Sequence, residues 1–279
     1  MRRQHAAANQ RGFSLVELVI VIVLTGVIGG IVAMQLGPTI QGYMKVGRRA
    51  GLTDQADTAL RRIVTDVRAA VPNSLRLQGA QCLELVPTSA GGRYRTGPDV
   101  AQAGNEAFLE HDAATTRFDV VTSFNVVPAG GDLVVIGNQN PDDVYNRRNA
   151  VLIDTVETRD AGSANAWMGP HRINLRAPIS IPFGYDGGRF VVVPAAQATS
   201  YVCNGDKLFR ITRPIAATQD CSVPSNSPVL ATGVTDCQFV FSPNQGATQQ
   251  SGFIQLQLTL SAGNESVPLT LGAHVSNVP

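Results

Sequence analysis

The sequence predicts an α+β fold, in which a long, kinked N-terminal helix packs on an antiparallel β-sheet C-terminal domain. An uncharged apolar run can cross a membrane, a second segment repeats apolar residues at helical spacing, and the remainder consists of short β-branched runs between turn residues. The expected organisation is a basic leader at residues 1–12, a helix at 13–71, and a β-rich globular domain at 72–279. The helix is expected to be transmembrane over about residues 13–36.

A single carboxylate, Glu17, lies at the start of the apolar run. From Leu18 to Met34 the chain carries no charge, and its roughly 17 residues at about 1.5 Å each just cover a hydrocarbon core. A charged side chain at this depth costs about 2.5–3.5 kcal/mol on insertion scales, so an intramembrane Glu indicates a function and a cationic partner. The alternative is a plain signal anchor whose Glu17 reaches the membrane interface.

The leader carries Arg2, Arg3 and Arg11 and no acidic residue. By the positive-inside rule it remains on the cytoplasmic side of the membrane, with the bulk of the chain outside. An ordinary secretory signal would place a small-residue cleavage site after its apolar region, and no Ala-x-Ala pattern stands near Leu36. We therefore expect one membrane span.

The N-terminal pattern resembles that of type IV prepilins and type II secretion pseudopilins. It consists of a short basic leader, an apolar helix and, between them, Gly12, Phe13, Ser14, Leu15, Val16 and Glu17. The resemblance implies cleavage between Gly12 and Phe13 by the prepilin peptidase, N-methylation of Phe13, and a role of Glu17 in assembly. It also implies major and minor pilins, the inner-membrane assembly platform and inner-membrane lipid as partners. The implied location is the inner membrane, single pass, with the C-terminal domain in the periplasm, and then a fibre or its tip at the cell surface.

A physical reason for this arrangement follows from the residues themselves. Cleavage would expose an α-amino group close to the membrane surface. The Glu17 of a neighbouring subunit could neutralise that group where both charges would otherwise be costly. Such a pair would set the axial register of subunits during assembly.

Further segments resemble a minor pilin of the mannose-sensitive haemagglutinin (MSHA) pilus. These segments are residues 71–76, 131–135, 189–193, 200–203 and 274–279. The likeness implies a low-abundance subunit that initiates or caps a pilus. A minor pseudopilin of a type II secretion system is the first alternative. A monomeric, signal-anchored surface-binding protein is the second, and it predicts an uncut leader and a harmless Glu17→Ala change.

The expected helix has a weakened middle and an amphipathic second half. Glycine and proline both disfavour helix, so we expect a kink near Gly37 and Pro38. Apolar residues from Leu52 to Val71 then recur at three- and four-residue spacing, which predicts one face packed on a domain. Pro72 pushes the residue before it out of the helical region and ends the helix.

Short β-branched runs follow, and they predict nine strands. The expected strands are 83–86, 118–121, 133–136, 151–156, 189–193, 200–203, 207–212, 237–241 and 253–260. Asn204 and Gly205 predict a hairpin between two of them. Residues 253–260 alternate apolar and polar side chains, so one face of that strand should be buried.

The four cysteines, Cys82, Cys203, Cys221 and Cys237, all lie in the part expected to be exported. An even number in an oxidising compartment predicts two disulfides. The sequence leaves three pairings open, with a preference for Cys221–Cys237 and Cys82–Cys203. Zinc is the competing use, but the chain has no Cys-x-x-Cys motif.

One loop presents side-chain oxygens in the manner of a calcium site. These belong to Asn138, Asn140, Asp142 and Asp143. The favoured alternative is an Asn/Asp-rich turn, whose side chains bond the local backbone.

Composition and motifs argue against two other classes of protein. A net charge of +1 and isolated arginine pairs do not give the basic patch of a nucleic-acid binder. The sequence has no nucleophile elbow and no phosphate-binding glycine loop, and His111-Asp112 is more typical of a surface loop than of a catalytic pair. We expect neither an enzyme nor a bound cofactor.

Overall fold

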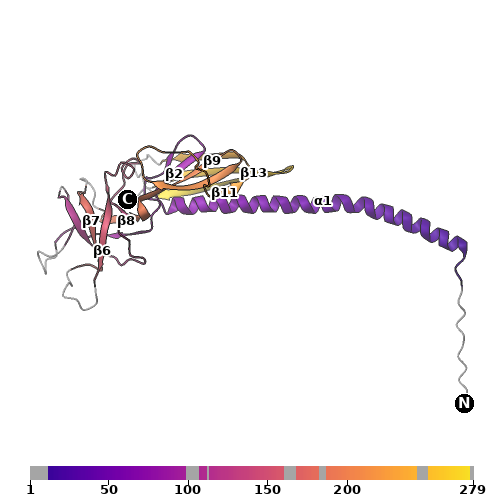
Figure 1. Ribbon diagram of the computed structural model, residues 1–279, viewed down its shortest axis with the longest axis horizontal. Helices are drawn as coiled ribbons and strands as arrows, with labels where there is room; N and C mark the ends of the chain where they lie inside the picture. The colour runs from indigo at the N-terminus through magenta and orange to yellow at the C-terminus, as the bar shows by residue number, and fades with distance from the viewer. Residues whose placement is uncertain are drawn as a thin grey trace, which may run out of the picture. The chain divides into compact units, whose positions relative to one another are not determined.

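The computed structural model describes residues 12–98, 107–111, 113–159, 168–181, 187–243 and 251–276. The chain divides into two compact units, Met1–Gly51 and Leu52–Pro279. A long helix, α1 (Leu15–Arg68), is followed by antiparallel strands that form three sheets (Figure 1). The predicted α+β class is therefore confirmed.

Helix α1 is continuous through Pro38 and bends in its N-terminal half (Figure 1). It ends at Arg68, earlier than the expected residue 71. The backbone beyond it joins a sheet instead: the Val71 N–H donates to the Val86 carbonyl over 2.8 Å, and the Thr88 N–H donates to the Ala69 carbonyl over 2.9 Å. These hydrogen bonds engage the Val71 N–H and the Ala69 carbonyl, which another turn of the helix would need for its own backbone hydrogen bonds.

The first sheet has the strand order β1-β2-β9-β10-β11. Its strands are β1 (Arg76–Leu77), β2 (Cys82–Leu85), β9 (Gln197–Asn204), β10 (Lys207–Pro214) and β11 (Val229–Thr232). The predicted hairpin is confirmed, because Asn204 pairs with Lys207 across a turn in which Gly205 has a φ of 60°. Glycine adopts this left-handed conformation without steric cost.

The second sheet consists of β12 (Val234–Ser242), β13 (Ser251–Ala262) and β14 (Glu265–Ser276). The predicted alternation in β13 is confirmed: Ile254, Leu256, Leu258 and Leu260 are buried, and the residues between them are not. One face of this sheet therefore contributes to the core.

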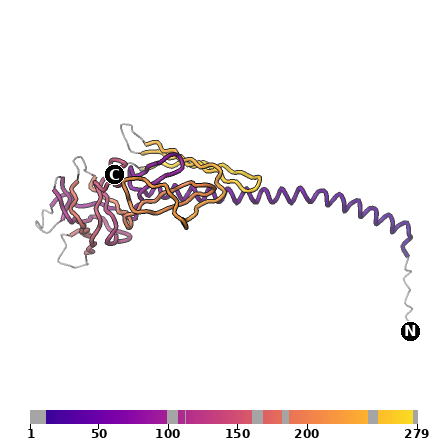
Figure 2. Tube along the Cα trace, turned by 45° about the horizontal axis from the view of Figure 1, so that its top comes forward, coloured from indigo at the N-terminus to yellow at the C-terminus, as the bar shows by residue number. Residues whose placement is uncertain are grey.

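The third sheet has the order β3-β8-β5-β6-β7-β4. Its strands are β3 (Ala90–Arg93), β8 (Arg189–Val193), β5 (Leu133–Val135), β6 (Ala150–Thr158), β7 (His171–Ile179) and β4 (Thr115–Val120). The Val121 N–H donates to the Arg93 carbonyl and the Arg95 N–H to the Asp119 carbonyl, each over 2.9 Å. The two outer strands thus meet, and the sheet closes around an apolar interior that includes Phe118 and Phe190, whose rings meet edge to face at 5.3 Å. In Figure 2 the magenta and salmon strands of this sheet form a group of their own.

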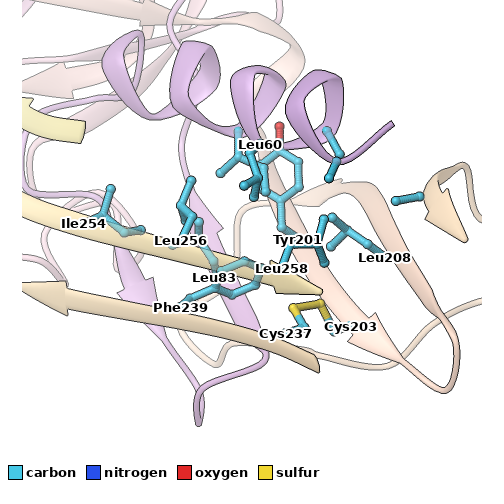
Figure 3. Packing of buried hydrophobic residues seen from close by; sticks show 14 of the residues in the cluster. Leu60, Leu83, Tyr201, Cys203, Leu208, Cys237, Phe239, Ile254, Leu256 and Leu258 are labelled. Carbon is cyan, nitrogen blue, oxygen red and sulfur yellow. A yellow bond between two sulfur atoms is a disulfide. The ribbon is translucent and has the colours of Figure 1, made fainter. Parts of the chain in front are cut away.

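The main core lies between the second half of α1 and the first two sheets. Leu52, Ala56, Ala59, Leu60, Ile63 and Val67 form the buried face of the helix. Figure 3 shows Leu60 opposite Tyr201 and near the row of apolar side chains that includes Leu256 and Leu258. The three- and four-residue spacing seen in the sequence produces this face.

A buried polar contact fixes the helix to β9 and β10. The Tyr201 hydroxyl donates to Asp66 Oδ2 over 2.5 Å, and Arg210 forms an ion pair with the same oxygen at 2.8 Å. Burial raises the pKa of the Tyr201 phenol, and the hydrogen bond with Asp66 raises it further. Asp66 is thus paired within its own chain.

Two disulfides form, as predicted, but the preferred pairing is wrong. The bonds join Cys82 with Cys221 and Cys203 with Cys237, across Cα–Cα distances of 6.0 and 6.5 Å. Cys82 lies opposite Val202 in the β2–β9 register, so the Cys203 side chain points to the other face of the sheet. There it meets Cys237 on β12, as Figure 3 shows.

Candidate functional site

The candidate site is the beginning of α1. Gly12, Phe13 and Ser14 precede the helix, which starts at Leu15 and carries Glu17 in its first turn. Ser14 Oγ accepts a hydrogen bond from the Glu17 N–H over 3.2 Å, the geometry of an N-cap residue. A serine followed three residues later by glutamate is the sequence of a capping box, and a carboxylate is favoured at the positive end of a helix.

The N-terminal part of the helix that follows is apolar and exposed. Every residue from 12 to 51 is exposed, including Phe13 at 78% and Met34 at 83%. Among the described residues, α1 is the one helix long and apolar enough to cross a membrane. Apolar surface of this extent needs lipid or protein around it.

This arrangement brings two charged groups close together in the sequence. A cut between Gly12 and Phe13 would leave an ammonium group about one helical turn before the Glu17 carboxylate. In an apolar environment each charge is costly alone, and pairing reduces the cost. Glu17 has no ion pair with any residue in the described part of the chain.

The loop considered for calcium has the hydrogen bonds of a turn. Asn138 Oδ1 accepts from the Val144 N–H over 2.9 Å, and Asp143 Oδ2 accepts from the Asn140 N–H over 3.0 Å and from its amide over 2.9 Å. Asn138 is buried, whereas Asp142 is exposed. Within the described residues, no group of three or more His, Cys, Asp or Glu side chains is placed to hold a metal. These contacts favour the Asn/Asp-rich turn over the calcium hypothesis.

The other candidate functional residues predicted from the sequence either have a structural role or lie, in part, outside the described residues. All four cysteines are in disulfides. Asp112 and most of the leader lie outside the described residues, so the His111-Asp112 pair is not described as a whole. Sequence reasoning missed a pocket on the third sheet between β3, β8 and β5. Only the register of these strands could have revealed it.

The comparisons with known proteins bear on the first helix. Residues 7–33 match the family model described as the prokaryotic N-terminal methylation motif, and this range includes Gly12, Phe13 and Glu17. The searches of curated proteins and of solved structures gave no match. The motif implies processing by prepilin peptidase and assembly with other pilins, and with the exposed apolar helix it indicates membrane anchoring. The chain carries the prokaryotic N-terminal methylation motif of the type IV pilin and pseudopilin class, a structural rather than an enzymatic class.

Proposed function

We propose that this protein is a minor type IV pilin that is cut between Gly12 and Phe13, methylated on Phe13 and assembled through Glu17. The observation that carries the proposal is an exposed apolar helix with a carboxylate in its first turn that has no ion pair with any described residue, directly behind the cleavage position of a methylation motif. In the fibre, the ammonium group of Phe13 pairs with Glu17 of the neighbouring subunit. The apolar helix forms the fibre core, and the β-rich domain faces outward.

We place this subunit in an MSHA-like pilus, where it acts in initiation or at the tip. The support is the resemblance, noted in the sequence, of residues 71–76, 131–135, 189–193, 200–203 and 274–279 to a minor pilin of the MSHA pilus. The alternative is a minor pseudopilin of a type II secretion system. Copurification of the chain from its native host with pilus minor subunits supports the first assignment, and copurification with secretion-system subunits supports the second.

The assembly role is tested by replacing Glu17 with glutamine, which keeps the shape of the side chain and removes its charge. In a host that lacks the native copy, Glu17→Gln should lower the chain in the sheared fibre fraction at least about tenfold, because each subunit loses one charge pair in an apolar environment. Immunoblots of membrane and fibre fractions measure the ratio.

Asp54→Asn provides the matched control, since Asp54 is an exposed acid on the same helix. This variant should enter the fibre normally. Normal incorporation of Glu17→Gln would contradict the assembly role. It would favour the monomeric, signal-anchored surface-binding protein, which also predicts an uncut leader.

A further inference from the structure

A pocket of about 370 Å³ lies on the outer face of the third sheet. Along β8, Phe190 and Val192 point into the closed interior, so Arg189 and Val191 point outward. Val191 and its neighbour Val135 on β5 line the pocket together with Val71. The volume is that of a site for a small organic molecule.

Two arginines are among the residues that line this pocket. Arg93 on β3 lies directly opposite Arg189 on β8 in the antiparallel register, and both side chains are exposed. Like charges in directly opposed positions destabilise a sheet. Neither arginine forms an ion pair with a carboxylate in the described ranges of the chain. An anion between the two guanidinium groups would remove this repulsion.

The other polar groups of the pocket are already occupied by the fold. Asn138 donates its amide to the Pro72 carbonyl over 2.8 Å and accepts from the Val144 N–H over 2.9 Å. Thr122 Oγ1 accepts from the Arg93 N–H over 3.1 Å. The remaining lining consists of valines and glycines together with Pro72 and Phe190. A sugar ring would leave its hydroxyl groups without partners on such a surface, whereas an apolar body suits it.

We propose that this pocket binds an organic carboxylate, with the carboxylate between Arg93 and Arg189 and an apolar body over Val135 and Val191. Guanidinium groups bind carboxylates through paired, charge-assisted hydrogen bonds, which give both affinity and orientation. The ligand is either a free carboxylic acid or the C-terminal carboxylate of a peptide that ends in an apolar residue. The site is independent of the role of Glu17.

Isothermal titration calorimetry on the full chain in zwitterionic nanodiscs tests the site. The probes are phenylacetate, a short peptide ending in phenylalanine, the same peptide with an amidated C-terminus, and inorganic phosphate. Phenylacetate or the free-carboxylate peptide should bind, and which of them binds more tightly identifies the source of the carboxylate. Arg93→Gln and Arg189→Gln should each weaken that binding at least about tenfold, the effect of losing a charge-assisted hydrogen bond.

Two further variants separate the pocket from general charge effects. Arg117→Gln removes an exposed arginine from β4 of the same sheet and should leave binding unchanged. Val191→Trp fills the pocket and should abolish binding while both arginines remain. Failure of both carboxylate probes to bind, equal binding of the amidated peptide, binding of phosphate alone, or an equal loss in Arg117→Gln would overturn the proposal.

The stability of the unliganded protein provides an independent readout. Because the opposed charges repel, Arg189→Gln should leave the Tm of the β-rich domain unchanged or raise it by up to about 4 °C. A fall in Tm of that size would show that Arg189 serves the fold, and the proposal would then fail even if binding were also lost.

Discussion

The two halves of α1 differ in what determines their sequence. Residues 15–51 are exposed throughout, whereas Leu60 and Ile63 in the second half are completely buried. A Cβ atom added at Gly26 or Gly30 would meet nothing within 4 Å. The chain itself therefore explains the apolar face of the second half but not the composition of the first half. Surroundings outside the chain must account for the first half.

The acids of the two halves make the same contrast. Asp66 is buried; it accepts a hydrogen bond from Tyr201 and forms an ion pair with Arg210. Glu17 is exposed and has no ion pair with any described residue. The comparison teaches that the second half is a structural part of the domain, whereas the acid of the first half takes no part in the ion pairs of the described residues.

The largest expected effect comes from truncating one leucine in each half. Leu60→Ala should destabilise the β-rich domain by about 2–5 kcal/mol, because it leaves a cavity among well-packed side chains. Leu24→Ala should leave the stability of the domain within about 0.5 kcal/mol, since Leu24 is exposed. Urea unfolding of the full chain in micelles, followed by near-ultraviolet circular dichroism, measures both. Equal losses would contradict the division of the helix.

Two aspartates of α1 provide the next comparison. Asp66→Asn should cost about 2–3 kcal/mol, because the half-buried Arg210 loses its charged partner. Asp57→Asn is the matched control, since the Asp57–Arg61 pair is also on the helix but lies at the surface; it should cost at most about 0.5 kcal/mol. The same unfolding experiment distinguishes them. A small cost for both would mean that Asp66 does not anchor the helix.

A smaller effect should appear with pH in the β-rich domain. His171 is only 6% exposed, and burial lowers its pKa below 6.5. The stability that neutral His171 contributes is fully present above the pKa that this imidazole has in the unfolded chain. It is lost as the pH falls through the lower pKa of the folded state, because the unfolded chain binds more protons in that range. Between about pH 7 and 5.5 the wild type should lose at most about 1.4 kcal/mol per pH unit through this residue.

Variants at two histidines isolate this contribution. His171→Gln should flatten the dependence of the unfolding free energy on pH, whereas His274→Gln, at an exposed position, should retain the wild-type slope. An unchanged slope in His171→Gln would contradict the assignment.

The smallest expected effect is that of a chelator. Asn138 and Asp143 already bond the backbone and amide groups of their turn. Addition of EDTA should therefore leave the Tm of the full chain within about 1 °C, since a metal bound only by the folded state would raise stability. A clear fall in Tm that calcium reverses would restore the calcium hypothesis.

Features that depend on local sequence were predictable, and those that depend on distant contacts were not. The Gly12–Glu17 pattern, the helical spacing of Leu52, Ala56 and Leu60, and the alternation in β13 are all readable within a few residues. Strand β14 was not among the predicted strands, because Pro268 and Gly272 weaken the sequence pattern of a strand. An outer strand of a sheet nevertheless tolerates both residues.

The disulfide pairing and the pocket required spatial neighbours. Cys203 and Cys237 belong to different sheets, and Arg93 meets Arg189 only through the β3–β8 register. The contact of Asp66 with Tyr201 likewise joins residues 135 positions apart. No local pattern encodes such pairs.

The central claim is that the first half of α1 becomes the N-terminal part of a processed fibre subunit. Intact-mass spectrometry of the full chain, isolated from its native membrane without reduction, tests this most directly. The account predicts the mass of a polypeptide that begins at Phe13, increased by the CH2 that one N-methylation adds and reduced by the four hydrogens of two disulfides. A polypeptide that still begins at Met1 would contradict it.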